Sequence, residues 1–265
     1  MSDDASGFLR DPVRTAIIVV TGSLLVLAVW EAGWLWRFMG DQHALGMDFD
    51  YYRAIGQRWL DTGSFYQPRQ LAGPYVVKAN VDVLYPPIAL LLFVPFTVLP
   101  WLAWWLIPIG IVACLTLRWR PAPWTWPILA FLVAWPPQVA NLLFGNSDMW
   151  VIAAIAGGLA VGWPGVLVIL KPSLVLFALA GIWRRSWWVA ALLLGLLSLA
   201  MLPLWVDFLA AIRNSDVGPT YSLQDVPPML IPVVAWLGRR PGGIERLTPA
   251  VRHALGGLRY WRPAR

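Results

Sequence analysis

Long apolar segments recur along almost the whole chain and restrict what it can fold into. The first runs from Thr15 to Trp36, and Glu31 is the only charged residue in it. Later apolar segments cover residues 87–99, 101–117, 124–144, 149–163, 164–183, 187–205 and 226–237. Because a membrane-spanning helix needs roughly 20 apolar residues, this series predicts an all-α polytopic membrane protein with about eight transmembrane helices.

The composition agrees with a membrane protein and excludes other classes. Hydrophobic residues make up 59% of the 265 residues and charged residues 13%. A soluble domain of this size could not bury so much apolar surface. We therefore exclude an ordinary soluble enzyme, a disordered chain and a nucleic-acid-binding domain. The single cysteine, Cys114, and the distant His43 and His253 offer no metal or haem cluster, so we expect no metal and no cofactor.

We expect one integral membrane domain over residues 1–265, in the cell membrane as a multi-pass protein, because the sequence has no internal repeat and no second domain; charge predicts its orientation. The apolar run 15–36 is too long for a signal-peptide core and is interpreted as an uncleaved anchor. The tail 239–265 has seven arginines against Glu245, so we expect it and residues 1–14 in the cytoplasm. The loop 40–85 has five acidic and four basic residues and is expected outside as a catalytic loop. Arg118 and Arg120 disagree with this eight-crossing arrangement, because it puts them outside.

Residues 48–61 are predicted to form an amphipathic helix on the outer membrane surface. With 100° of rotation per residue, Asp48, Tyr51 and Tyr52 lie on one face of the helix together with apolar side chains. Asp50 and Arg53 lie on the opposite face. A carboxylate on an aromatic face costs free energy unless it is paired. Two interpretations of Asp48 stay open: a general base whose pKa burial raises, and a helix N-cap.

Asp48 and Asp50 also form a D-x-D pair, which is typical of a metal site for a sugar nucleotide. On a helix the two side chains point about 200° apart and cannot share one ion. We expect Asp50 to pair with Arg53 on a solvated face instead.

Two ionisable residues lie inside predicted spans. Lys171 stands before Pro172, and a cation at that depth is a functional candidate that could hold a phosphate. The alternative is a lysine that snorkels to the interface. For Glu31, near the outer end of the first span, we favour an interfacial or packed role.

The segment Gly145–Asp148 precedes an apolar helix. We interpret it as a helix start, with Ser147 as the cap and Asp148 favourable at the helix dipole. The eight-crossing arrangement puts this turn inside, which argues against a role for Asn146 at an outer site. Tyr85 stands before two prolines that are ordinary at a helix start.

Three blocks of residues, in order, resemble the GT87 (DUF2029) family over about residues 10–205. Block one is Asp48-Phe49 with Tyr51-Tyr52, Gly63 and Tyr66; block two is Tyr85-Pro86-Pro87 with Pro95 and Leu99-Pro100; block three is Lys171-Pro172 with Arg184-Arg185-Ser186-Trp187. This family contains polytopic GT-C-class glycosyltransferases, including bacterial polyprenyl-phosphate-mannose-dependent mannosyltransferases. Members often have Gly-Gln where this chain has Gly145-Asn146, and they usually have more spans on the C-terminal side.

The resemblance implies a function. A sugar carried on polyprenyl phosphate would be transferred to a lipid or glycan acceptor at the outer face, with inversion and with Asp48 as the base. Lys171 or loop arginines would steady the leaving phosphate, and tyrosines would contact sugar or prenyl chain. The substrate-binding residues predicted in this way are Lys171, Tyr51, Tyr52, Arg53, Arg58, Tyr66, Tyr85 and Asn146.

Two further functions stay open beside the glycosyltransferase. One is a non-catalytic lipid-binding or accessory membrane protein that keeps a shortened GT-C fold. The other is a small transporter, which is disfavoured because no repeated pair of broken helices occurs and Lys171 is the only basic residue deep in a span.

Overall fold

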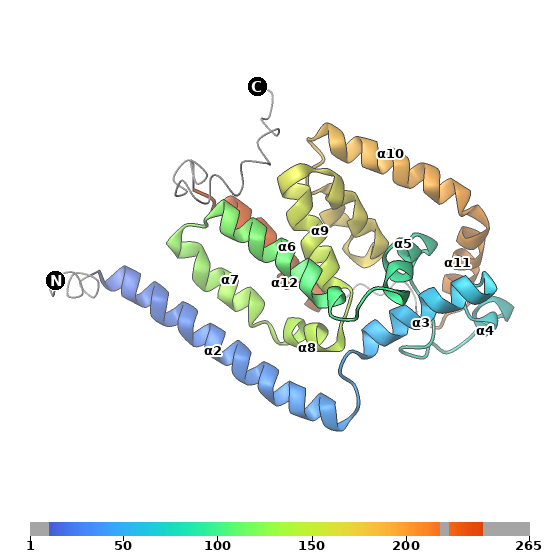
Figure 1. Ribbon diagram of the computed structural model, residues 1–265, viewed down its shortest axis with the longest axis horizontal. Helices are drawn as coiled ribbons and strands as arrows, with labels where there is room; N and C mark the ends of the chain where they lie inside the picture. Colours follow the sequence, from blue (N-terminus) through green and yellow to red (C-terminus); the bar gives the residue numbers. More distant parts are fainter. Residues whose placement is uncertain (1–10, 218–222, 241–265) are drawn as a thin grey trace.

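The computed structural model describes residues 11–217 and 223–240, and every regular element within these ranges is a helix. The α-helices are α2 (Pro12–Asp41), α3 (Met47–Thr62), α4 (Pro68–Ala72), α5 (Leu90–Phe93), α6 (Ala103–Trp119), α7 (Trp126–Val133), α8 (Pro136–Phe144), α9 (Asp148–Val161), α10 (Arg185–Ala200), α11 (Leu202–Asn214) and α12 (Val226–Leu237). The 3-10 helices are η1 (Pro87–Ala89), η2 (Val94–Thr97), η3 (Pro123–Thr125), η4 (Trp163–Leu170), η5 (Pro172–Leu179) and η6 (Leu223–Asp225). The predicted all-α fold is confirmed (Figure 1).

Helix α2 is long because its sequence carries good start signals and no break. Asp11 caps it by accepting hydrogen bonds from the backbone N–H groups of Val13 and Arg14, at 3.1 and 3.3 Å. Pro12 stands at the first turn, where its missing N–H costs nothing. The helix lies along the outside of the molecule against α7 and α8 (Figure 1). Only Ala28 and Met39 are buried in it, so most of its apolar surface faces outward.

Helix α9 forms the centre of the fold. It is apolar all round, which is typical of a helix buried on every side, and Ile155 at its middle is fully buried. It packs against α6, α12 and η4. Glycines allow the close approach: a Cβ on Gly158 would lie 2.5 Å from the carbonyl oxygen of Ala180 and 2.8 Å from the Cα of Gly165.

A second, aromatic cluster surrounds α3. Tyr52 stacks on Phe93 with ring centroids 4.6 Å apart, and Phe49 lies 5.6 Å from Trp104. The predicted amphipathic helix 48–61 is confirmed as α3. Its aromatic face, however, is buried against α5 and η2, so this face serves the protein core rather than a membrane surface.

Arginines from segments far apart in the sequence gather at one end of the bundle, here called the arginine end. The backbone N–H of Ala122 bonds to the oxygen of Gly238, which brings the residues after α6 beside those after α12. The indole rings of Trp183 and Trp236 lie 6.0 Å apart, so the start of α10 is at the same end. The arginines in or next to these helix ends are Arg118, Arg120, Arg184, Arg185, Arg239 and Arg240.

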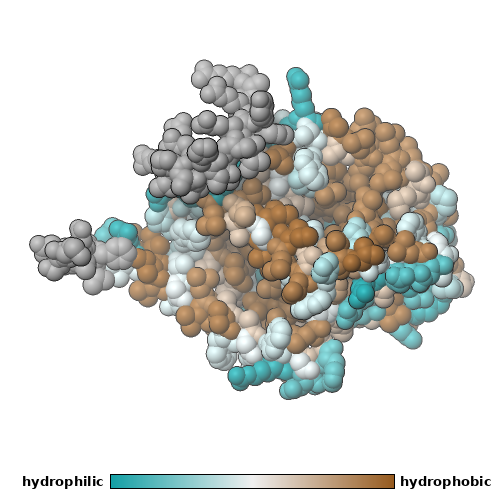
Figure 2. Space-filling model, viewed as in Figure 1, coloured by the Kyte–Doolittle hydropathy of each residue, from teal (hydrophilic) through white to brown (hydrophobic). Residues whose placement is uncertain are grey.

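The opposite end, here called the polar end, holds the starts of α3, α9 and α12. The Asn141 amide donates to Asp148, at 2.9 Å, and to Asp225, at 3.4 Å. The Asn146 amide donates to Asp48 at 2.7 Å. Figure 2 shows hydrophilic side chains over α3 and α4 and at the end of α2, with hydrophobic surface over most of the remaining visible face.

Two segments that were predicted as spans turn back instead. The segment of η4 and η5 leaves the arginine end, reaches Lys171 and returns, and the two 3-10 helices pack on each other as a hairpin. Lys171 is the break between them, with φ −119° and ψ 90°. The segment Pro87–Thr97 begins after Tyr85 and ends shortly before Trp104, whose indole bonds to the Gly145 oxygen, so both its ends lie at the polar end.

The prediction of about eight transmembrane helices is wrong in number. Among the described residues, α2 alone is long and apolar enough to cross a membrane unbroken, and there are up to three such spans if two bent pairs each count once. The pairs are residues 123–144, bent by 60°, and 185–214, bent by 82°. The other apolar helices have 10 to 17 residues. Prolines and glycines between them end each helix early.

Several predictions lie outside the described residues. They concern most of the tail 239–265 and most of the N-terminal stretch 1–14, both expected in the cytoplasm.

Gly145 lies against the aromatic cluster around α3, and its replacement should destabilise the fold. It has a φ of +75°, and a Cβ there would lie 2.8 Å from the Trp105 ring. Gly63 has a φ of +71° with nothing near its Cβ position. We expect Gly63→Ala to lower the free energy of unfolding by ~1 kcal/mol, the cost of the left-handed backbone, and Gly145→Ala by a further ~1–3 kcal/mol from overpacking. Unfolding in detergent, followed by tryptophan fluorescence, measures both; equal losses would contradict the overlap.

Candidate functional site

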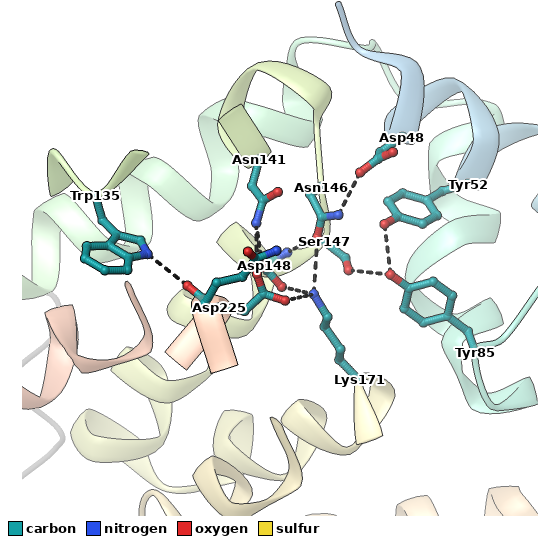
Figure 3. A network of polar contacts seen from close by, with 11 residues as sticks. Asp48, Tyr52, Tyr85, Trp135, Asn141, Asn146, Ser147, Asp148, Lys171 and Asp225 are labelled. Carbon is teal, nitrogen blue, oxygen red and sulfur yellow. Dashed lines mark hydrogen bonds and ion pairs between the residues drawn. The ribbon is translucent and has the colours of Figure 1, made fainter. Parts of the chain in front are cut away.

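Asp48 lies in the first turn of α3 and is half-buried. The helix begins after Gly46, which takes a left-handed conformation, and no side chain caps it. The N-cap interpretation of Asp48 is therefore wrong. Its Oδ2 instead accepts a hydrogen bond of 2.7 Å from the amide of Asn146, which comes from the turn between α8 and α9 (Figure 3).

Burial raises the pKa of the Asp48 carboxyl above its ordinary value. The hydrogen bond from Asn146 and the charge of Lys171 lower this pKa by a smaller amount. Raising the pKa brings a carboxylate nearer to the range in which a general base works efficiently. A reaction that needs ionised Asp48 should therefore lose rate at a higher pH than it would with an exposed aspartate.

The Asn146 amide is held on both sides. Its Oδ1 accepts from the backbone N–H of Asp148 at 3.1 Å and from Lys171 Nζ at 3.4 Å. The predicted helix start is confirmed in position, because Ser147 stands at the N-cap of α9, but its side chain makes no capping bond. That hydroxyl lies 3.1 Å from the Tyr85 hydroxyl instead. The contact with Asp48 also puts this turn at the polar end, which corrects the eight-crossing arrangement.

Lys171 is an ion-paired residue at the tip of the η4–η5 hairpin. Its side chain is 14% exposed and pairs directly with Asp148, which is 1% exposed. The carboxylate of Asp225 lies 3.7 Å from the same ammonium. The snorkelling interpretation is therefore wrong: the amine faces carboxylates inside the protein. Two carboxylates share this one ammonium, and the Asn141 amide donates to both (Figure 3).

The predicted tyrosines fall into two groups. The hydroxyls of Tyr52 and Tyr85 are 2.9 Å apart and continue to Ser147, so they form a chain of hydroxyls beside Asp48 (Figure 3). Tyr51 donates to the backbone oxygen of Asp82 at 2.5 Å, and Tyr66 donates to the backbone oxygen of Tyr85 at 2.9 Å. Burial raises the pKa of the phenols of Tyr51, Tyr52 and Tyr66, so they remain neutral donors. Tyr66 is 1% exposed, which puts it in the core.

The predicted loop arginines lie apart from this site. Arg53 is exposed on the far face of α3, as is Asp50, and no ion pair joins these two described residues. Arg58 donates to the backbone oxygen of Phe65, and burial lowers its pKa. The structure thus brings Asp48, Asn146, Tyr52, Tyr85 and Lys171 together, and it leaves Arg53, Arg58 and Tyr66 outside the group.

Sequence reasoning missed the partners of Lys171. Asn141 and Asp225 were not considered as site residues, and Asp148 was considered only for the helix dipole. A signal was present, because Asp148 and Asp225 each stand at the start of an apolar helix. A lone lysine in an apolar segment needs a carboxylate partner, and acids at the starts of neighbouring helices are the obvious candidates.

A largely apolar groove of about 230 Å³ runs along α9 from this cluster. Tyr85, Ser147 and Lys171 line its polar end, and Trp163 and Pro164 line the other. Between them its walls are formed by Ala89, Leu92, Phe93, Ile111, Trp150, Val151, Ala153, Ala154, Gly157, Leu167 and Leu170. A long hydrocarbon with a polar head fits this distribution of side chains.

Neither a metal site nor a relative identifies the function of this site. Within the described ranges no three His, Cys, Asp or Glu side chains come together as metal ligands. No protein-family model, curated protein or solved structure matches the chain.

Removing one member of the buried ion pair should cost more than removing both. We expect Asp148→Leu alone to lower the free energy of unfolding by ~3–5 kcal/mol, because it leaves the ammonium with a single, more distant carboxylate. The double variant Asp148→Leu with Lys171→Met should recover a large part of this loss. Asp61→Asn, in an exposed residue bonded to Gln57, is the control and should change little. Additive losses in the detergent unfolding cycle would contradict the coupling.

Proposed function

We propose that the protein is a membrane glycosyltransferase of the GT-C class, which transfers a sugar from a polyprenyl-phosphate donor to a lipid or glycan acceptor. The three sequence blocks that resemble the GT87 family motivate the chemistry. The observation that carries the proposal is the position of Asp48. A half-buried carboxylate with a raised pKa is linked through the amide of Asn146 to Lys171, which lines the polar end of an apolar groove.

In the proposed reaction the prenyl chain occupies the groove along α9. The phosphate lies at the groove's polar end, where the hydroxyls of Tyr85 and Ser147 donate to it. Asp48 removes the proton from an acceptor hydroxyl, whose oxygen forms a bond to the anomeric carbon. The bond from that carbon to the phosphate oxygen breaks on the opposite side, so the configuration inverts and prenyl phosphate leaves. Preorganised donors at the leaving oxygen are what such a reaction needs.

By length and composition one to three spans are supported among the described residues; we propose that shorter apolar helices cross as well, which gives six crossings with the arginine end in the cytoplasm. Six segments run from one end to the other: α2, α6, the α7–α8 pair, α9, α10 and α12. Basic residues concentrate on the cytoplasmic side of membrane proteins, and arginines after α6, before α10 and after α12 share one end. Arg118 and Arg120, which disagreed with eight crossings, agree with six. The loop 40–85 and Asp48 then face outward.

Thiol labelling tests this topology. In a chain with Cys114→Ala, we expect Ser64→Cys to react with an impermeant thiol reagent on intact cells. Arg118→Cys should react only after the cells are made permeable, because it lies at the arginine end. The eight-crossing arrangement requires both to react on intact cells, so labelling of residue 118 from outside would overturn the six-crossing proposal.

Asp48→Asn tests the catalytic role. The amide has nearly the shape of the carboxylate but accepts no proton, so we expect transfer from a labelled polyprenyl-phosphate sugar to fall by at least ~100-fold. Asp50→Asn is the matched control, because Asp50 is exposed on the other face of α3, and it should keep its activity. Melting temperature in detergent separates chemistry from folding. A folded Asp48→Asn protein with near-normal transfer would contradict the assignment.

One observation favours a non-catalytic lipid-binding protein as the second candidate. The only lysine at the groove is already paired with Asp148, so its charge is not free for a phosphate. This candidate predicts that membranes bind the labelled donor equally well with wild-type and Asp48→Asn protein, and that neither transfers the sugar.

A further inference from the structure

The orientation of the Asn146 amide is determined by its neighbours. Amide oxygen and nitrogen are told apart by their hydrogen-bond partners. The oxygen side of Asn146 faces two donors, the Asp148 backbone N–H and the Lys171 ammonium, at 3.1 and 3.4 Å. Neither group accepts a hydrogen bond. The N–H side of the amide therefore points at the carboxylate of Asp48.

Lys171 is itself fixed in place. The hairpin tip brings it to the start of α9, where it pairs with Asp148, and Asp225 at the start of α12 lies 3.7 Å away. The ammonium is thus held by two carboxylates while one of its protons faces Asn146. This arrangement couples α9, α12 and the η4–η5 hairpin to a single amide, and through that amide to α3.

We propose that Lys171 is a positioning residue for Asp48: it keeps the amide of Asn146 turned so that its N–H group donates to the Asp48 carboxylate. This inference rests on the proposed function for the role of Asp48 as a base. It goes beyond that function by giving Lys171 a role: Lys171 acts through Asn146, whereas the sequence alone suggested that it holds the donor phosphate.

The expected effect on Asp48 has a definite sign. The groups that face Asp48 are Tyr51 and Tyr52 on its own helix, Tyr85 from the preceding loop, Asn146 before α9 and Lys171 from the hairpin, with Asp148 and Asp225 behind Lys171. Of these, the Asn146 N–H and the Lys171 charge favour the ionised carboxylate. Loss of Lys171 removes its charge and one of the two donors that hold the Asn146 oxygen, so that only the Asp148 backbone N–H opposes a turn of this oxygen toward Asp48. Both changes raise the pKa of Asp48, so the carboxyl stays protonated to higher pH.

An infrared titration of the substrate-free protein in detergent tests this directly. The Asp48 band is the carboxylic-acid band missing from Asp48→Asn. We expect Lys171→Met to move its titration upward by ~1 pH unit, the lower range for loss of a nearby opposite charge. Lys171→Arg keeps a cationic donor and should move it much less. Lys78→Met is the control, because Lys78 is the chain's other lysine and is exposed; it should leave the Asp48 titration unchanged. An unchanged titration in Lys171→Met would overturn the proposal.

Lys171→Met leaves two buried carboxylates without a cation, so it is paired with a second variant. Lys171→Met with Asp148→Asn keeps the net charge of the cluster, and an upward shift of the Asp48 titration is again expected; no shift in a folded double variant also overturns the proposal.

Kinetics separate the two roles of Lys171. A positioning residue predicts that Lys171→Met lowers kcat and moves the acid limb of the pH profile upward, while the donor KM stays within about twofold. A large rise in donor KM with an unmoved acid limb would assign Lys171 to the phosphate instead. The infrared result stands without substrate, so failure of the glycosyltransferase proposal and failure of this one are distinguishable.

Discussion

The ion pair between Lys171 and Asp148 is the contact on which the rest of the polar end depends. A carboxylate that is 1% exposed must be paired and hydrogen-bonded, and Lys171 reaches it only because η4 and η5 bring it back from the arginine end. The pair therefore fixes how deep the hairpin enters the bundle. The Asn141 amide and Asp225 extend the contact to α8 and α12. One buried ion pair thus connects α8, α9, α12 and the η4–η5 hairpin next to Asp48.

The local hydrophobic pattern of the sequence predicted where helices form, but it predicted poorly which of them cross the bundle and which turn back. The helix at 48–61 follows from a repeat of apolar residues over four turns, which needs no knowledge of its neighbours. Apolar length says that a segment is buried, but it does not say whether the segment crosses or turns back. The predicted span 164–183 is broken at Lys171-Pro172, and a glycine with positive φ stands near each of its ends, Gly162 just before it and Gly181 within it. These features mark a hairpin once its contacts with α9 are known.

The site was half visible in the sequence. Asp48 stands out because helical periodicity puts its carboxylate on an aromatic face, which is unusual and can be recognised from the local sequence. Its partner Asn146 is 98 residues away in sequence, and no repeat or spacing relates the two. The eight-crossing arrangement placed Asp48 and Asn146 on opposite sides of the membrane. It counted the turned-back segment 87–97 as a crossing, and this error reverses the side assigned to every later residue until the second turned-back segment is reached. Asp225 carries a weaker signal, its position at the start of an apolar helix, which does not by itself say that it lies beside Lys171.

The surplus of negative charge near Lys171 bears on how a donor would lie in the groove. Asp148 and Asp225 together carry one more charge than Lys171 neutralises, and in a poorly solvated interior this difference acts over several ångströms. A lipid phosphate in the groove would be repelled from the side of Asp225 and favoured beside the hydroxyls of Tyr85 and Ser147, on the far side of Lys171. In the proposed reaction this sets the sugar between the phosphate and Asp48, with the acceptor approaching from the α3 side. In the proposed reaction the same charges that hold the hairpin in place would also orient the donor for displacement from the face opposite its phosphate.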